Sequence, residues 1–201
     1  MVRTGNLQDL EAAIVHAEAA LEATPEDHPN KAGWLNNLGI MLSRRYKQTG
    51  NLQDLEAAIV HLEAAVEATP KDHPNKAGWF NHLGIMLSSR YKRTGNVKDL
   101  EAAIVHAEAA VEATPKDHPD KAGRLSNLGS SLSSRYERTG NLQGLEAAID
   151  HAEEALEATP EYHPYKAAML NNLGNMLSSR YGRTGNLQDL EAAIVHAEAA
   201  V

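Results

Sequence analysis

The chain has 201 residues, of which 42% are hydrophobic and 4% aromatic, and its formal net charge is −8. It contains no cysteine, which excludes disulfides, thiolate nucleophiles and zinc–thiolate sites. No apolar run approaches the roughly 18 residues that a membrane-spanning helix needs, so we expect no membrane partner and an intracellular, cytoplasmic protein.

The sequence is organised by a repeat of 45 residues, marked by the triplet Thr-Gly-Asn. The triplet begins at Thr4, Thr49, Thr94, Thr139 and Thr184. A fixed period of this length indicates a stacked repeat array. We therefore expect one solenoid over residues 1–201, a portion of a longer protein, with repeats at 4–48, 49–93, 94–138 and 139–183 and a partial repeat at 184–201.

Each repeat begins with a predicted helix, as the copy that starts at Thr49 shows. Gly50 and Asn51 form a turn, and Pro70 ends the segment. Its apolar residues are spaced by three and four, as on the buried face of a helix. They are Leu55, Ala58, Ile59, Leu62, Ala65 and Val66.

Another predicted helix follows the Asp-His-Pro segment, with Pro74 near its first turn. Its apolar face holds Ala77, Phe80, Leu83, Gly84, Leu87 and Tyr91. Two antiparallel helices cannot bury their faces alone, so neighbouring repeats must stack. The sequence predicts an all-α solenoid of nine helices. We call the helix after Asp-His-Pro the first helix and the helix after Thr-Gly-Asn the second helix.

Two segments resemble the tetratricopeptide repeat: LNNLGIML at 35–42 and AAIVHLEAAVEATP at 57–70. The resemblance implies a right-handed superhelix of antiparallel helix pairs, whose concave face is lined by first helices and binds a peptide. The Asp-His-Pro segment beside LNNLG is similar to the repeats of kinesin light chains. The near-identical copies and the RYKRTGN segment also resemble arrays attached to nucleotide-binding or protease-like domains in fungal and bacterial signalling proteins. That likeness implies a sensor or scaffold portion of such a protein.

The copies differ mainly in their first helices, on the side opposite Leu35, Leu38 and Leu42. We interpret that side as a peptide-binding surface. Its candidate residues are Trp34, Asn36, Asn37, Ile40, Arg44, Trp79, Asn81, His82, Ile85, Ser89, Arg124, Ser126, Asn127, Ser130, Ser134, Asn171, Asn172, Asn175 and Ser179. Two alternatives stay open: drift on a solvated face, and packing of residues such as Trp34 and Met41 on an adjacent repeat.

Side-chain amides recur on this surface, at Asn36 and Asn37 and at the equivalent positions of later copies. An amide both donates and accepts hydrogen bonds, so a row of amides suits the backbone of an extended peptide. In the kinesin-light-chain resemblance, the asparagines of LNNL have that role. The alternative is a hydrogen bond between the helices of neighbouring repeats. Ser126 interrupts the row.

Charge is divided between the two kinds of helix. With Arg3 included, the first helices hold 16 Lys or Arg and 2 acidic residues, and the rest of the chain holds 3 Lys and 25 acidic residues. The first helices thus carry +14 and the remainder −22. About half of the positive charge can be used in pairs with second-helix glutamates across the stack, by the arginines at 45, 90, 135 and 180. The remainder favours an acidic peptide or protein segment as ligand.

No pattern indicates an enzyme, a cofactor or a metal site. The histidines recur once per repeat, about 10 Å apart in a stacked array, which is too far to share a metal ion bound at about 2 Å. The Asp-His-Pro histidines indicate turn chemistry. Catalysis needs unlike groups that converge at one place, and identical rungs offer none. Nucleic acid is disfavoured because few aromatic residues are available for base stacking and the net charge is negative.

Self-assembly is the alternative function from another class. The sequence begins and ends on a second helix, and its last apolar face holds Leu190, Ile194 and Val201. Apolar ends without polar capping repeats could join copies end to end, as homo-association of this portion.

Overall fold

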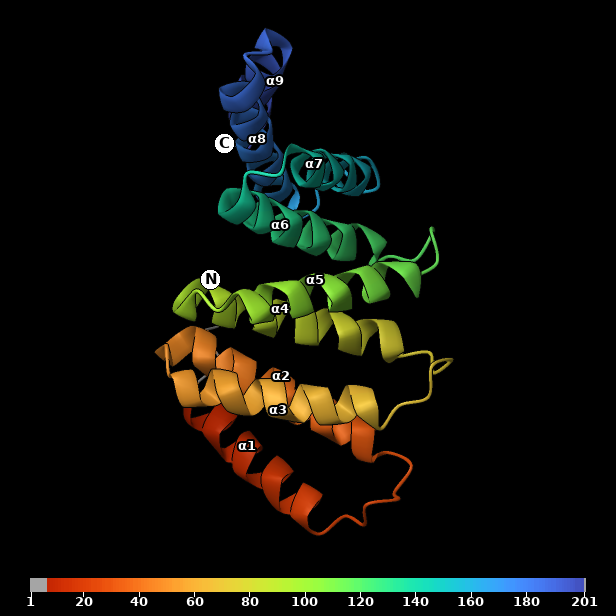
Figure 1. Cartoon of the computed structure of the whole chain (residues 1–201). Helices are drawn as coiled ribbons and strands as arrows, with labels where there is room; N and C mark the ends of the chain where they lie inside the picture. Colours follow the sequence, from red (N-terminus) through yellow and green to blue (C-terminus); the bar gives the residue numbers. More distant parts are fainter. Residues whose placement is uncertain (1–6, 201) are drawn as a thin grey trace. The chain divides into compact units, whose positions relative to one another are not determined.

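The computed structural model describes residues 7–200, and these residues form nine α-helices and no strand. The all-α prediction and the helix count are confirmed for this part of the chain (Figure 1). The helices are α1 (Leu7–Glu22), α2 (Lys31–Thr49), α3 (Leu52–Glu67), α4 (Lys76–Thr94), α5 (Val97–Glu112), α6 (Lys121–Thr139), α7 (Leu142–Glu157), α8 (Lys166–Thr184) and α9 (Leu187–Ala199). Arg3, Thr4 and Val201 lie outside the described residues.

The chain forms two compact units, Met1–Asp99 and Leu100–Val201, and α5 begins in the first and continues in the second. In the first unit, α1 packs on α2, α2 packs along α3, α3 packs on α4, and α2 also meets α4. The even-numbered helices are first helices and the odd-numbered helices are second helices. A single solenoid over residues 1–201 stays a prediction.

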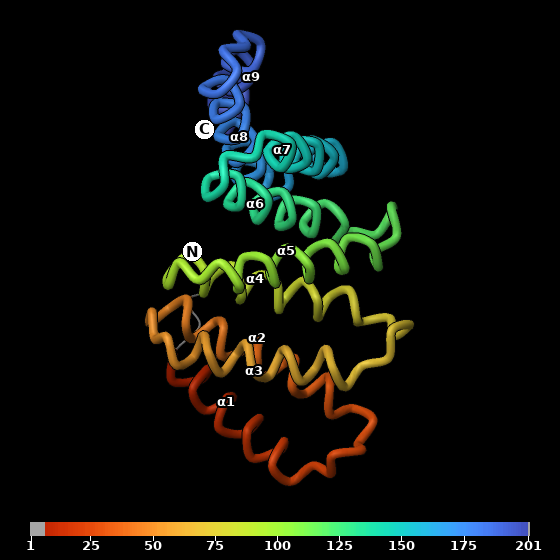
Figure 2. Tube along the Cα trace, viewed as in Figure 1, coloured from red at the N-terminus to blue at the C-terminus, as the bar shows by residue number. Residues whose placement is uncertain are grey.

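The second unit repeats this arrangement with α6, α7, α8 and α9. Helix α6 packs along α7, α7 packs on α8, α8 packs along α9, and α6 also meets α8. Figure 2 shows the chain turning back at each short connection, so that consecutive helices run antiparallel. Within each unit, a first helix therefore contacts the first helix of the next repeat, and the second helix between them in sequence packs against both.

The predicted apolar face of α3 is confirmed. Its six residues from Leu55 to Val66 are all buried, and five of them are at most 1% exposed. On α4, Ala77, Leu83 and Leu87 are buried as predicted, whereas Phe80 and Tyr91 are half-buried. Because each helix of a repeat packs on two neighbours, its buried surface is wider than the single stripe that the spacing predicts.

The Thr-Gly-Asn triplet is the turn between a first and a second helix. Gly50 ends α2 with φ of 72°, a left-handed conformation that glycine adopts without steric cost. The hydroxyl of Thr49 donates to the Arg45 carbonyl at 2.8 Å and accepts from the Asn51 N–H at 3.2 Å. The Asn51 side chain accepts from the Gln53 N–H at 3.0 Å and so caps α3. One triplet thus ends one helix and begins the next.

The Leu-Gly pair of each first helix marks a close approach to the second helix. A Cβ placed on Gly39 would lie 2.7 Å from the Leu62 side chain, and one placed on Gly129 would lie 2.9 Å from the Ala148 carbonyl oxygen. Real Cβ atoms do not approach so closely. Glycine is therefore required at these positions by packing between the two helices of a pair.

The longer connection between a second and a first helix is held by histidine and lysine. The Nδ1 atom of His73 accepts a hydrogen bond from the Asn75 N–H at 3.1 Å, which confirms the predicted turn role of the Asp-His-Pro histidines. The Lys76 Nζ atom donates to the carbonyl oxygens of Val66 and Thr69, each at 2.5 Å. These carbonyls end α3, so the lysine caps the negative end of the preceding helix.

Candidate functional site

The first helices present three kinds of variable position, which differ in how many of their side chains are buried. The first kind faces the end of the preceding second helix. Trp79 is 7% exposed, and Arg124, 8% exposed, donates a hydrogen bond to the Thr114 hydroxyl and pairs with Asp120. The sequence interpretation places both on the peptide-binding surface, and it is wrong for these two residues because their side chains are buried. The open alternative of packing on a neighbouring helix holds for this position.

The second kind of variable position faces the next first helix. The Asn36 side chain is 5% exposed, and its Oδ1 atom lies 3.0 Å from Nδ1 of His82 on α4. This hydrogen bond joins two neighbouring repeats within the first unit. Asn36 is therefore not available to a ligand, and the alternative of a helix-to-helix hydrogen bond holds at this rung. His82 is half-buried and shares in the same contact.

The third kind of variable position is exposed or half-buried and forms one row along each first helix. We call these rows the exposed stripes. In the first unit they comprise Asn37, Ile40, Arg44 and Lys47 on α2 and His82, Ile85, Ser89 and Lys92 on α4. In the second unit they comprise Asn127, Ser130, Ser134 and Glu137 on α6 and Asn172, Asn175, Ser179 and Gly182 on α8. The remaining candidates lie beside these rows: Asn81 and Ser126 are half-buried, and Asn171 is exposed.

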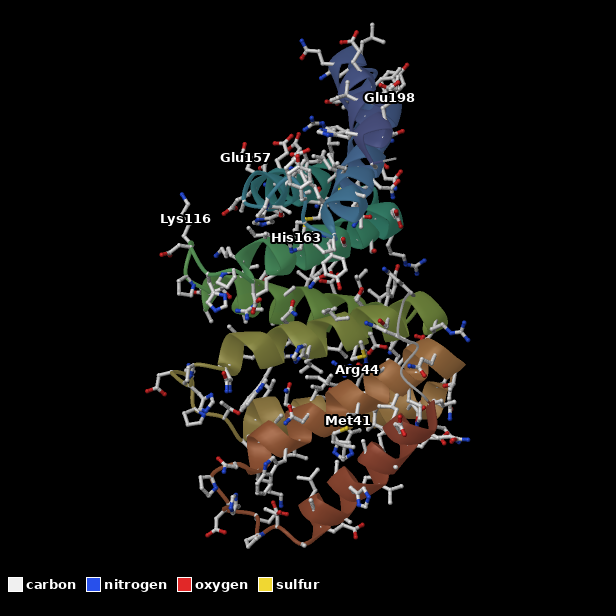
Figure 3. The ribbon with its side chains drawn as sticks, turned by 180° about the vertical axis from the view of Figure 1, so that it is seen from behind. Met41, Arg44, Lys116, Glu157, His163 and Glu198 are labelled. Carbon is white, nitrogen blue, oxygen red and sulfur yellow. The ribbon has the colours of Figure 1, made fainter. Side chains whose placement is uncertain are left out.

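A pocket of about 230 Å³ adjoins the stripe of α2 in the first unit. It lies between α1 and α2 and is lined by Ala17, Ala20, Thr24, Trp34, Asn37 and Met41. Figure 3 shows Met41 between these two helices and Arg44 farther along α2. Trp34 is 37% exposed, in contrast to the buried Trp79, and its ring stacks on His28 at 4.7 Å between centroids. The pocket wall is therefore mainly apolar and firmly held.

We expected the repeated arginines to pair with glutamates across the stack, but most of them bind an aspartate. The Arg45 guanidinium donates from Nε and Nη2 to both carboxylate oxygens of Asp54, at 2.9 and 2.6 Å. Arg90 and Asp99, and Arg180 and Asp189, form the same bidentate pair. The expectation is wrong for these three arginines because an aspartate stands nine residues later, directly across the tight turn. It is confirmed for Arg135, which pairs with Glu101 at 3.6 Å. The hydrogen bond to Asp54 raises the pKa of Arg45.

Much of the positive charge of the first helices is thus used inside the fold. The lysines that begin first helices cap second helices, and the arginines of the last turn bind aspartates. Burial lowers the pKa of Lys76, consistent with a cation enclosed among carbonyl oxygens. In the first unit the basic side chains of the exposed stripes are Arg44, Lys47 and Lys92. These three side chains are exposed.

Four of the second-helix histidines are half-buried, namely His61, His106, His151 and His196, and His16 is exposed. Burial lowers the pKa of His61 and of His106, and Glu18 opposes this effect at His61. No group of three or more potential metal ligands occurs among residues 7–200. Within the same range, no helix combines the length and the apolar character that crossing a bilayer requires.

Two features of the site were missed by sequence reasoning, although a signal for each was present. Asp54, Asp99 and Asp189 recur at one position of the second helices, nine residues after an arginine that also recurs. Lys31, Lys76, Lys121 and Lys166 recur at the first position of every first helix. A charged residue that recurs in most copies indicates a structural partner.

Comparison with known proteins agrees with this geometry. The family of the tetratricopeptide repeat matches residues 32–75 and 167–200, which are two copies of the 45-residue period. The chain therefore has two segments that match the tetratricopeptide-repeat family, within a fold that resembles arrays of this repeat. Arrays of this kind are scaffolds for protein–protein interaction, so the fold indicates a protein partner. No curated protein sequence matches the chain.

Solved structures share the fold at low sequence identity. The crystal structure of MamA superimposes with a TM-score of 0.63 at 18% identity, over 96% of this chain and 87% of that one. The crystal structure of BtubC (BKLC) from P. vanneervenii superimposes with a TM-score of 0.69 at 18% identity, over 96% of this chain and 73% of that one. At this identity the likeness concerns the tetratricopeptide fold alone.

Proposed function

We propose that this repeat array binds an acidic peptide or protein segment on the exposed stripes of α2 and α4. The observation that carries the proposal is the composition of these stripes. Ile40 and Ile85 stand at equivalent positions of neighbouring repeats, beside Arg44, Lys47 and Lys92. No acidic residue belongs to either stripe. An apolar row flanked by cations suits a segment that carries both aliphatic and acidic side chains.

The pocket beside α2 supplies the anchor for such a segment. An apolar side chain of the ligand would enter the space between Trp34 and Met41 and be removed from water. Asn37 lines the pocket and also belongs to the stripe, so its amide is placed to bond the ligand backbone. Arg44 and Lys47 then lie about two and three turns farther along α2 than Asn37, where they can bind acidic side chains.

The proposal assigns a non-enzymatic role, as an interaction portion of a larger cytoplasmic signalling protein. Its support is the repeat itself, because each rung presents the same groups as its neighbour and catalysis requires unlike groups at one place. Near-identical second helices and divergent first helices are typical of a scaffold whose recognition surface has been allowed to vary.

The test is a selection of displayed random peptides on the immobilised chain, followed by affinity measurement with a fluorescein-labelled peptide of the enriched sequence. We expect an enriched motif that combines acidic and aliphatic residues. Arg44→Glu and Ile40→Asp should each weaken binding roughly ten-fold or more, because they reverse a charge or place a charge in an apolar contact. Both side chains lie on the stripe, so the melting temperature should change little.

Matched controls exist on α8. Ser179→Glu and Asn175→Asp make the same kinds of change at the equivalent positions of the second unit. Affinity should be retained in both. An enriched peptide whose affinity falls equally in the α2 and α8 variants would contradict the assignment to α2 and α4. A folded chain that enriches no motif would contradict peptide recognition by these stripes.

Self-association is the second candidate, favoured by one observation on α9. Ile194 is 51% exposed, whereas Ile14, Ile59, Ile104 and Ile149 at the equivalent position are 1–2% exposed. A second copy that covered α9 would remove this side chain from water. Light scattering over a range of concentrations tests the idea, with Ile194→Asp as the disrupting variant. A monomer at every concentration would exclude it for this chain.

A further inference from the structure

The turn between α6 and α7 differs from the other turns between a first and a second helix. In the turns after α2, α4 and α8, an arginine binds an aspartate through two hydrogen bonds of 2.6–2.9 Å. These aspartates are 3–4% exposed. In the turn after α6 the arginine is kept as Arg135, but the aspartate position is occupied by Gly144. We call Arg135 with the first turn of α7 the third joint.

Arg135 lies near a glutamate, as do its three counterparts. Its Nη1 atom lies 3.6 Å from Oε2 of Glu101 on α5, the second helix of the same repeat. The equivalent glutamates are Glu11, Glu56 and Glu146, and each contributes to raising the pKa of the matching arginine, Arg45, Arg90 or Arg180. The short ion pairs of those three arginines are with their aspartates. Glu101 therefore meets Nη1 of Arg135, whereas a bidentate carboxylate would bind Nε and Nη2 as in the other joints.

The third joint also has room for a carboxylate. No atom lies within 4 Å of a Cβ placed on Gly144, apart from its chain neighbours and the backbone of its own helix. The side chain of Arg135 is 35% exposed, compared with 26–30% for Arg45, Arg90 and Arg180. The first turn of α7 contains no acidic residue, unlike the first turns of α3, α5 and α9. The backbone N–H groups there favour a negative charge in the same place.

We propose that the third joint is a carboxylate-binding site that takes an aspartate or glutamate side chain, or a small free carboxylate, from outside the chain. The Nε and Nη2 groups of Arg135 bind the two carboxylate oxygens in the bidentate geometry that its three counterparts show. The helix end adds to this site but does not define it. The site is defined by Arg135, because the equivalent arginine of each of the three other joints binds a carboxylate.

This site is distinct from the exposed stripes of α2 and α4. It consists of Arg135 and the first turn of α7, which lie in the second unit. It binds one charged group and selects by geometry, whereas the stripes bind an extended segment. Loss of peptide binding by Arg44→Glu and loss of carboxylate binding at Arg135 are separate results, so either proposal can fail alone.

The experiment follows the arginine Nε–H signals of the full ¹⁵N-labelled chain by NMR during titration with sodium acetate. Sodium chloride keeps the ionic strength constant, because exposed charges are screened by salt. We expect a saturable shift of the Arg135 signal and no shift for Arg45, Arg90 or Arg180, whose guanidinium groups already bind aspartates. A second titration uses a blocked tetrapeptide with one aspartate. A stronger response to the peptide would identify a polypeptide segment as the source, and equal responses would identify a general carboxylate site.

Two variants make the test decisive. Gly144→Asp supplies the carboxylate from the chain itself and should abolish the response of Arg135 to acetate. Gly144→Ala adds a Cβ without charge and should leave the response intact. The proposal is overturned if the Arg135 signal shows no saturable shift in the natural chain. It is also overturned if Gly144→Asp responds to acetate as strongly as Gly144→Ala.

Discussion

The two units are built from one repeat, yet they expose different surfaces. In the first unit, the stripes of α2 and α4 include two isoleucines, one arginine and two lysines beside asparagine, histidine and serine. In the second unit, the stripes of α6 and α8 hold only asparagine, serine, one glutamate and one glycine. The core positions hardly change between the units: Leu38 and Leu128, and Ile59 and Ile149, are equally buried. Packing between helices therefore fixes one side of each first helix and leaves the exposed stripe free to differ.

The units also differ in the turns that join first and second helices. Both joints that lie wholly in the first unit bind a buried aspartate, and in the second unit the third joint does not. The turn triplet is the same in all of them. A structural ion pair can thus be lost in one copy while the turn persists, because Thr-Gly-Asn ends one helix and begins the next by its own hydrogen bonds.

Of the changes compared between the two units, replacing the joint arginine should give the largest difference in the free energy of unfolding. Arg45→Ala leaves the buried carboxylate of Asp54 without its cation, and we expect the free energy of unfolding to fall by about 3 kcal/mol. Arg135→Ala removes a partly exposed contact of 3.6 Å with Glu101, and we expect a loss of less than about 1 kcal/mol. Urea denaturation followed by circular dichroism measures both. Equal losses would show that the aspartate contributes nothing beyond the shared glutamate.

Alanine at the closely packed glycines Gly39 and Gly129 should lower the free energy of unfolding by a smaller amount than Arg45→Ala. Gly39→Ala brings a Cβ against Leu62, and Gly129→Ala brings one against the backbone oxygen of Ala148, so each should cost about 2 kcal/mol. In the first unit the obstacle is a side chain, and Leu62→Ala should relieve part of the cost. In the second unit the equivalent residue is already Ala152, so no such relief is available.

Gly33→Ala is the control for this comparison. Gly33 lies on α2, and a Cβ placed on it would have no atom within 4 Å outside its own helix, so alanine there should stabilise the helix by roughly 0.5–1 kcal/mol. The double variant of Gly39 and Leu62, measured against both single variants, gives the coupling energy. A coupling energy of zero would show that Leu62 is not what excludes a larger residue at position 39.

The fold was predictable because spacing alone carries it. The recurrence of Thr-Gly-Asn, the apolar spacing from Leu55 to Val66 and the turn histidines all agree with the structure. The candidate site was predictable only in part. Asn36, Trp79 and Arg124 vary between copies as exposed residues do, yet they are buried, because each meets a neighbouring helix: Asn36 bonds His82, and Arg124 bonds Thr114. Variation between copies cannot distinguish such buried contacts from exposure.

An aspartate at position 144 would restore to the second unit the ion pair that the first unit has. Gly144→Asp places a carboxylate nine residues after Arg135, where Asp54 stands after Arg45. Because the other copies already hold this residue in the same turn, the variant should fold without rearrangement. We expect it to be more stable than Gly144→Ala by about 1 kcal/mol, from the ion pair and the acidic side chain in the first turn. Alanine is the reference because any residue with a Cβ gains over glycine in a helix.

The ion pair has a signature that helix propensity lacks. The difference between Gly144→Asp and Gly144→Ala should shrink when Arg135 is also changed to alanine, and it should shrink in about 1 M sodium chloride, which screens partly exposed charges. A difference that survived both changes would come from the helix end rather than from Arg135. The missing aspartate of the third joint would then cost the protein no ion pair. A difference that depends on Arg135 would instead show that Gly144→Asp forms the same ion pair as the joints of the first unit.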